Sequence, residues 1–334
     1  MGSTKAASFA PWVAKAAERA SSGAPLSNDL LWMLLEDPVN VVGRGAPPEA
    51  RVYEPVELAW QQCEDVPIND SGGAIHEVSQ SFVRRLSFDR HKCYRIHRFR
   101  FATHDVVEES EDLNTLLSRF AVERERVAAP GDSLQVSNVA GFHSAQDLFK
   151  PGRSAPASAL FFATAACVQR AATIDAAMVA AAGETPPPSP RAGDVDGSWD
   201  VPDGWVNVSR SGALNHLHHH ADSVLATVYY AQVPQNCGGA LLFRLTPGTG
   251  NGTAEPHEDR HVPRMWSAGN AVNEDELDDA SRTGVVSFLR LLPQPGTLLI
   301  FPGWLSHSVE PHFGDEPRIS FASNWDLPCP PGDL

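Results

Sequence analysis

Apolar residues in the first half of the chain follow the spacing of amphipathic helices. Leu30, Leu31, Leu34 and Leu35 recur three and four positions apart, which places them on one side of a helix. The longest segment of this kind ends at a glycine that is soon followed by several prolines. We therefore expect a mostly helical first half, with helices over residues 11–20, 28–36, 113–125 and 157–182.

After the proline-rich segment 186–190, short apolar runs separated by glycine and proline replace the helical spacing. Runs of this length and composition are typical of strands. The expected strands span residues 204–209, 213–220, 224–233, 240–245, 284–291, 296–301, 307–310 and 318–324. Such a series predicts an α+β protein whose core is a jelly roll, or double-stranded β-helix, supported by helices from the N-terminal half.

This pattern also predicts how the chain is organised. We expect residues 1–92 to form a mostly helical extension of unknown role, and residues 93–334 to form the main domain. Within that domain, 93–190 would be helical support and 200–334 the jelly roll. The polar segment 246–282 is too long for a hairpin turn, and loops of that length are commonly lids or insertions.

Composition narrows the function classes. The chain has 334 residues and a formal net charge of −15, so it lacks the basic surplus that binds a nucleic-acid backbone. No apolar run approaches the length of a membrane span, and the N-terminus lacks a secretory apolar core. The five cysteines are odd in number and form no CxxC pair, which indicates a reducing compartment. We expect a cytoplasmic protein, although organelle targeting stays open.

A cluster of histidines precedes the third expected strand. The stretch NHLHHHADS, residues 215–223, holds four histidines and one aspartate. Side chains two apart on a strand share a face, so His218 and His220 lie together and Asp222 can join them. Such a set suits a transition metal such as Fe, Zn, Mn or Ni. The alternative is a solvated histidine-rich loop, and His216 and His219 are expected to be peripheral.

A second set of candidate residues lies near the C-terminus. His307 follows an apolar strand and a Pro-Gly turn, and Arg318 and Ser320 share one face of the next strand. A buried arginine is costly unless an anion meets it. The pair therefore suggests a binding fork for a small dicarboxylate beside the metal.

These segments together resemble the iron(II)- and 2-oxoglutarate-dependent oxygenase superfamily. The run HADSVLATVYY, residues 220–230, with the distant His307 and the R-I-S at residues 318–320, is similar to its metal- and cofactor-binding motifs. The closer resemblance is to the 2OG-Fe(II) oxygenase family of bacteria and phages, and it covers about residues 95–334. The residues that carry it are Trp205, Asn207, Gly212, His218, His220, Tyr229, Tyr230, Phe301, Pro302, Trp304, Leu305, His307, Val309, Arg318 and Asn324. The segment SNVAGFHSAQDLF, residues 137–149, also looks like that family.

The resemblance implies a dioxygenase with Fe(II) and 2-oxoglutarate as cofactors. Arg318 and Ser320 would bind the distal carboxylate of 2-oxoglutarate, with Asn207 and Tyr230 as further contacts; only one of Tyr229 and Tyr230 can face the cavity. The expected reaction uses O2 to hydroxylate a small molecule or an amino-acid or protein side chain, and it releases succinate and CO2.

The two resemblances disagree about the third metal ligand. An H-x-D motif gives His220, Asp222 and His307, whereas the closer family's H-x-H motif gives His218, His220 and His307. Two other function classes also use such residues. One is a zinc-dependent hydrolase with an H-x-H-x-D site, and the other is a cupin-like metal-binding protein. The hydrolase motif calls for a histidine after Asp222, where this chain has Ser223, and a cupin-like protein would not need Arg318 and Ser320.

Overall fold

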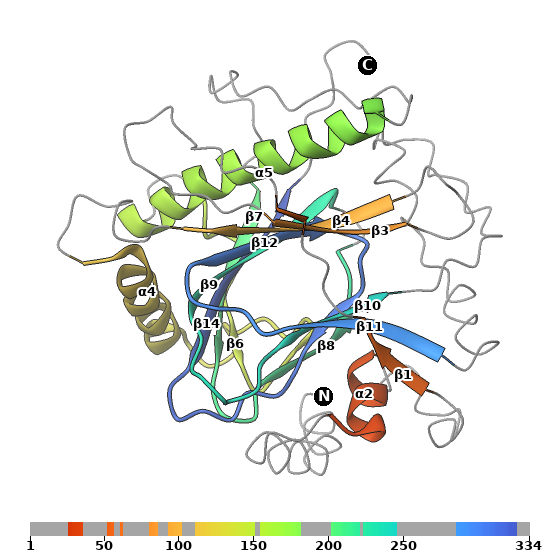
Figure 1. Ribbon diagram of the computed structural model, residues 1–334. Coiled ribbons are helices and arrows are strands. Elements are labelled where there is room, and N and C mark those ends of the chain that lie inside the picture. Colours follow the sequence, from red (N-terminus) through yellow and green to blue (C-terminus); the bar gives the residue numbers. More distant parts are fainter. Residues whose placement is uncertain are drawn as a thin grey trace.

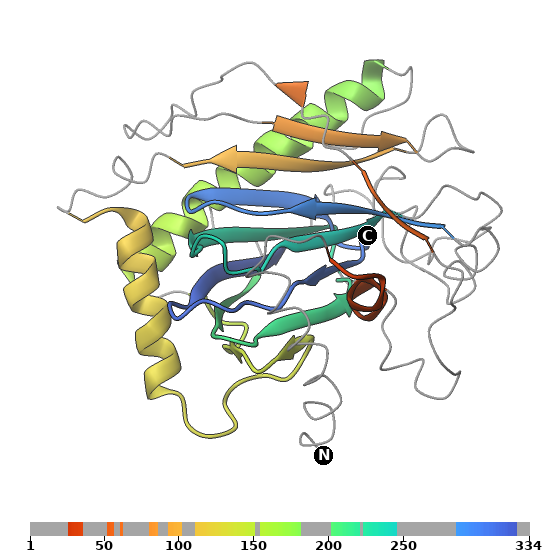
Figure 2. The same cartoon turned by 60° about the horizontal axis from the view of Figure 1, so that its bottom comes forward.

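Two β-sheets face each other, and three helices lie on their outer sides (Figures 1 and 2). The computed structural model describes residues 26–35, 52–56, 61–62, 80–85, 93–101, 111–150, 154–181, 202–220, 223–245 and 285–325. The smaller sheet has the strand order β1-β11-β10-β13-β8-β5, and the larger has the order β2-β3-β4-β12-β9-β14-β7-β6.

The strands of the first half are β1 (Val52–Pro55), β2 (Gln61–Gln62), β3 (Gln80–Arg85), β4 (Cys93–Arg100), β5 (Asn138–Val139) and β6 (Phe142–His143). Those of the second half are β7 (Asp203–Ser209), β8 (Leu214–His218), β9 (Leu225–Gln232), β10 (Leu241–Leu245), β11 (Val285–Leu291), β12 (Thr297–Pro302), β13 (His307–Val309) and β14 (Arg318–Trp325). Strand β1 runs parallel to β11, and the remaining ladders are antiparallel.

Strands β7 to β14 form the jelly roll that the sequence predicts. The four central strands β12-β9-β14-β7 of the larger sheet face β11-β10-β13-β8 of the smaller one. Strands β10 and β11 pair within the smaller sheet. At every other step from β7 to β14 the chain passes to the opposite sheet, which is the winding of a double-stranded β-helix. All eight strands expected from the sequence are confirmed, with ends that shift by one or two residues.

Apolar side chains are buried on both faces of the larger sheet. Successive residues of a strand point to opposite faces, so neighbours along a strand belong to two different apolar clusters. On β12, Leu298 and Ile300 belong to the cluster beneath the helices. Leu299 and Phe301 belong to the cluster between the sheets. All six residues of β12 are buried, which explains why its sequence is a continuous apolar run rather than an alternating one.

The helices cover the outer faces of the sheets. Helix α5 (Ala155–Ala181) lies along the larger sheet, beside α4 (Leu113–Val127), and α2 (Asn28–Leu35) covers the smaller sheet near β1 (Figure 1). Helix α4 begins at Asp112, whose side chain accepts hydrogen bonds from the backbone N–H groups of Asn114 and Thr115. These three predicted helices are confirmed. The expected helix over 11–20 and the polar segment 246–282 lie outside the described residues.

The expectation of a mostly helical first half is incomplete, because the described residues there form strands β1 to β6 as well as helices α2, α4 and α5. Strands β3 and β4 extend the larger sheet, and β1 extends the smaller one. The sequence CYRIHRFR of β4 has polar residues on both faces, at positions 95, 97, 98 and 100, so it shows no clean alternation, and two of them, Arg95 and His97, are buried all the same. The division of the chain into residues 1–92 and 93–334 stays a prediction.

A buried ionic cluster ties α5 to the larger sheet. Asp175 of α5 forms an ion pair with Arg95 of β4 and lies 3.2 Å from His97 Nε2. Burial alone would raise the pKa of the Asp175 carboxyl, but the charges and hydrogen bonds of His97 and Arg95 together lower it. By length and composition residues Ala155–Ala177 could also cross a membrane, yet in this structure the helix packs on the sheet through side chains such as Leu160 and Cys167.

Replacing Asp175 with Asn should lower the free energy of unfolding by about 3–5 kcal/mol, because it leaves the Arg95 charge buried without its partner. Glu123→Gln, which breaks an exposed ion pair with Arg126, should leave the free energy of unfolding almost unchanged. The pKa of Asp175 is lower in the folded state than in the unfolded state. Its contribution to the free energy of unfolding is therefore complete when the pH is above the unfolded-state pKa of about 3.9, and it is lost as the pH falls through the folded-state pKa. Urea unfolding at several pH values measures this; equal costs for both substitutions would contradict it.

Candidate metal centre

Three histidines from different parts of the chain converge between the sheets. His218 ends β8, His220 follows it, and His307 begins β13. Strands β8 and β13 are antiparallel neighbours in which His218 and His307 stand opposite each other. One ring nitrogen from each histidine lies within 4.8 Å of the other two. The Nε2 atoms of His220 and His307 are 3.4 Å apart.

His220 lies beyond the end of its strand, so contacts with another turn position it. Its backbone N–H donates to the Gly303 carbonyl at 2.7 Å, and the Gly303 N–H donates to Val224 O at 3.0 Å. A Cβ atom at residue 303 would lie 2.8 Å from the His220 carbonyl oxygen and closer still to that of Ser223. The Pro302-Gly303 turn thus holds the His220 segment at a distance that only glycine permits.

Backbone carbonyls orient two of the three imidazoles. Nδ1 of His218 lies 2.7 Å from His216 O, and Nδ1 of His307 lies 2.8 Å from Leu305 O. A carbonyl can only accept, so Nδ1 carries the proton in each ring and Nε2 keeps its lone pair. Histidines that bind metals in proteins are held by the same kind of second contact.

Burial keeps the three rings neutral. Burial, together with the charges of neighbouring histidines, lowers the pKa of His218 to about 4 and that of His220 to about 3. The pKa of His307 is also well below its ordinary value, again mainly because the ring is buried. Neutral imidazoles are the form that binds a metal ion, so the donor set fits a divalent cation at pH 7 without loss of ring protons.

The histidines line a cavity of about 150 Å³ whose far wall is the larger sheet. Three polar residues form a row across neighbouring strands there, because Asn207 of β7 pairs with Ser320 of β14, which pairs with Tyr230 of β9. Arg318 lies two residues before Ser320 and also lines the cavity. The four cofactor-binding residues expected from the sequence therefore converge on one side of the histidine cluster.

Arg318 is a buried charge without a carboxylate partner among the described residues. Its side chain is 2% exposed, and its guanidinium carbon lies 4.9 Å from the centre of the Tyr230 ring. Gly239, at φ +74°, makes room for it, since a Cβ there would lie 2.8 Å from Arg318 Cδ. Burial lowers the pKa of Arg318, which expresses the cost of holding this charge away from water.

Two buried polar atoms at this end of the cavity still have capacity for a ligand. Arg318 Nε has no hydrogen-bond partner within the described structure, and the Tyr230 hydroxyl interacts there with the Arg318 guanidinium but lies outside ideal hydrogen-bond distance. Buried donors of this kind cost free energy unless a ligand satisfies them. A carboxylate would pair with both, so this end of the cavity fits the distal carboxylate of 2-oxoglutarate.

The remaining candidate residues divide between cavity and core. Asp222 lies outside the described residues. His219 was expected on the opposite face but is exposed and lines the cavity, because the strand ends at His218 and the alternation ends with it. Tyr229 points away from the cavity and donates to Asn114 Oδ1 of α4 at 2.6 Å, so Tyr230 alone faces inward.

A further wall of the cavity consists of residues that have no recognisable pattern in the sequence. Ser137, His143 and Gln146 come from the segment around β5 and β6. The Ser137 hydroxyl lies 3.4 Å from His218 Nε2. Trp205, expected to be a packing residue, lines the cavity and stacks on His143 and His220. The only signal for these residues in the sequence is the family-like segment 137–149.

Comparison with known proteins agrees with this site. Residues 203–324 match the model of the family described as "Putative 2OG-Fe(II) oxygenase". These residues contain the whole jelly roll, the three histidines and the Arg318-Ser320 pair. The family match and the site together support a 2-oxoglutarate-dependent oxygenase, an oxidoreductase with Fe(II) and 2-oxoglutarate as cofactors.

Solved structures of related chemistry are similar at low identity. A prolyl-4-hydroxylase from Pseudomonas putida is 12% identical with a TM-score of 0.36, and the match covers 65% of this chain and 87% of that one. A Trichoplax adhaerens prolyl hydroxylase in complex with a hypoxia-inducible-factor peptide fragment is also 12% identical, at a TM-score of 0.32 over 64% and 78%. The carbocyclase SnoK from nogalamycin biosynthesis is 14% identical, at 0.38 over 71% and 81%. No curated protein sequence matches the chain.

Replacing Gly303 with Ala should weaken Fe(II) binding by about 10-fold to 100-fold, because the added Cβ displaces the segment that carries His220. Gly141→Ala is the matched control, since its Cβ would meet nothing closer than 3.4 Å and should leave iron affinity unchanged. Anaerobic Fe(II) titration of both variants measures the difference. Equal affinities would show that the turn does not position His220.

Proposed function

We propose that the protein hydroxylates a C–H bond of a small molecule or of an amino-acid or protein side chain. The reaction consumes one O2 and one 2-oxoglutarate for each substrate. One oxygen atom enters the substrate C–H bond, and the other enters succinate as 2-oxoglutarate loses CO2. The observation that carries the proposal is the buried Arg318, which has no carboxylate partner among the described residues and lines the same cavity as the three histidines.

The protein's own residues prepare the site for this chemistry. Bound Fe(II) supplies the redox capacity that links decarboxylation of 2-oxoglutarate to oxidation of the substrate. Arg318 neutralises the distal carboxylate through charge-assisted hydrogen bonds, and Ser320 and Tyr230 add hydroxyl donors. Apolar side chains such as Leu241 and Phe301 complete the cavity wall and limit the access of water.

We further propose that His218, His220 and His307 are the protein's iron ligands. The support is their mutual distance and the carbonyl contacts that aim two of the Nε2 atoms into the site. Such a set is neutral, whereas a carboxylate ligand would cancel one of the two charges of Fe(II). The retained charge would strengthen the attraction for the dianion 2-oxoglutarate.

The direct test of the proposed function is anaerobic titration of the Fe(II) protein with 2-oxoglutarate. We expect the visible metal-to-ligand charge-transfer band that chelation of iron by a 2-oxo acid produces.

Arg318→Ala should weaken 2-oxoglutarate binding by about 30-fold or more while iron affinity stays unchanged, because it removes the partner of a desolvated carboxylate. Arg210→Ala, which removes an exposed arginine near the end of β7, should leave both affinities unchanged.

Three outcomes would count against the proposed function. Absence of the band together with tight zinc binding would favour a zinc hydrolase or a cupin-like metal protein. Equal loss of iron and cofactor affinity in Arg318→Ala would show that the arginine supports the fold rather than the cofactor. A band without substrate-dependent succinate formation would rule out the hydroxylase reaction.

Substitutions of His218 and Asp222 decide the third ligand. His218→Ala should lower Fe(II) affinity by at least about 100-fold, whereas Asp222→Ala should change it by less than about 3-fold, since losing one of three ligands costs far more than a change outside the ligand set. Anaerobic iron titration and the charge-transfer band report the two effects. The reverse order of effects would assign the ligand set His220, Asp222 and His307 instead.

A further inference from the structure

A buried histidine outside the metal cluster also lines the cavity. His143 ends β6, is 4% exposed and lines the cavity. Within the described part of the chain, the group of histidines with convergent ligand atoms contains His218, His220 and His307 but not His143. The metal site therefore leaves this buried side chain without a role.

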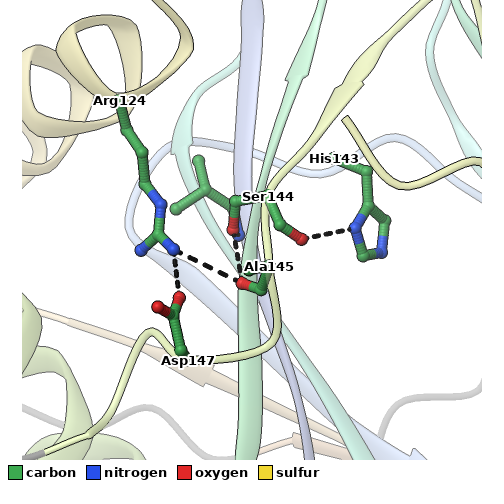
Figure 3. Close-up of polar contacts among 6 residues, drawn as sticks. Arg124, His143, Ser144, Ala145 and Asp147 are labelled. Atoms are coloured by element: carbon green, nitrogen blue, oxygen red, sulfur yellow. Dashed lines mark hydrogen bonds and ion pairs between the residues drawn. The ribbon is translucent and has the colours of Figure 1, made fainter. Parts of the chain in front are cut away.

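The proton position on His143 follows from one contact. Its Nδ1 lies 2.8 Å from Ser144 O, as Figure 3 shows. Because the carbonyl accepts, Nδ1 carries the hydrogen and Nε2 holds a lone pair. Among the described residues no hydrogen bond reaches that Nε2, and the atom is open to the cavity that His143 lines. The cavity wall thus contains a hydrogen-bond acceptor that a ligand can reach.

Neighbouring residues hold the ring in this orientation. The ring stacks on Trp205, with centroids 5.3 Å apart and an angle of 16° between the planes. Arg124 of α4 forms an ion pair with Asp147 and donates to Ala145 O at 3.5 Å, which anchors the segment after His143 (Figure 3). The hydroxyl of Ser144 accepts from the Val206 N–H at 3.0 Å, so the same segment is also fastened to β7. A side chain fixed in this way is preorganised for binding.

His143 lies away from the predicted 2-oxoglutarate carboxylate. It pairs with Asn207 of β7, and β7 pairs with β14, so two strand spacings, about 10 Å, separate its backbone from the strand that carries Arg318. A carboxylate would also face the lone pair of Nε2 and be repelled. The ring therefore belongs to a different part of the cavity from Arg318.

The open side of the cavity is near this wall. Val136, two residues before β5, lines the cavity with 67% of its side chain exposed, and His219 on the other side is exposed as well. Ser137 and His143 line the same cavity as these two exposed residues, whereas Arg318 is 2% exposed.

We propose that His143 Nε2 positions the substrate by accepting a hydrogen bond from a hydroxyl or N–H group close to the C–H bond that is oxidised. This assignment rests on the proposed oxygenase function and narrows its substrate class. It requires a donor on the substrate, so compounds that lack one at that place bind weakly. His143 is a positioning residue in this scheme and takes no part in the redox chemistry.

Matched pairs of small probes test the assignment in the anaerobic Fe(II)–2-oxoglutarate complex. The pairs are phenol and anisole, indole and 1-methylindole, and 2-pyrrolidinone and its N-methyl derivative, each titrated while the charge-transfer band is followed. Wild type should bind the donor member of a pair about 10-fold more tightly than its methylated partner, because the methylated compound leaves a buried acceptor unpaired. His143→Phe, which keeps a ring to stack on Trp205, should abolish this preference.

Two controls separate binding from folding and from the cofactor. His143→Gln returns an acceptor near the position of Nε2 and should restore part of the preference. Both variants should keep the wild-type affinity for 2-oxoglutarate and the wild-type unfolding midpoint. A preference that persists in His143→Phe, or wild type that does not discriminate within any pair, would overturn the assignment. A charge-transfer band that never forms would instead refute the proposed oxygenase function.

Discussion

The pairing of β8 with β13 is the constraint on which the site depends. It brings His218 and His307 opposite each other although long segments of chain separate them. Side chains alternate across a strand, so a slip of one residue would turn one of these histidines to the other face of the sheet. The Pro302-Gly303 turn then holds the segment after β8 and adds His220. A single register and one tight turn thus assemble three donors that no local segment could supply.

The molecule treats two buried charges in opposite ways. Asp175 meets Arg95 and His97 beneath α5, and this cluster connects a helix with the sheet. Arg318, equally buried, has no carboxylate partner among the described residues and faces the cavity. A buried charge that the fold itself neutralises serves stability, whereas one that it leaves unpaired favours an anionic ligand. Arg95 thus belongs to a structural ion pair, whereas the surroundings of Arg318 favour an anionic ligand.

Strand β14 shows how one sheet serves both purposes. Ile319 and Phe321 pack into the core beneath the helices, whereas Arg318 and Ser320 face the cavity between the sheets. The same alternation sends Tyr229 toward α4 and Tyr230 toward Arg318. Helices on the outer face stiffen the sheet, so the polar row on its inner face presents ligand-binding groups at nearly fixed spacing. The cavity needs no flexible loop to place its cofactor contacts.

Local sequence determined the elements whose patterns are complete within a few residues. The eight strands of the jelly roll, three helices, the histidine cluster and the Arg318-Ser320 pair all follow from spacing along the chain. Strand β4 could not be predicted, because its buried Arg95 and His97 depend on Asp175 of a distant helix. His143 and Ser137 were missed for the same reason: their roles depend on the pairing of short strands with β7 and β8. Periodicity determines which face a residue occupies, and only tertiary contact decides what that face meets.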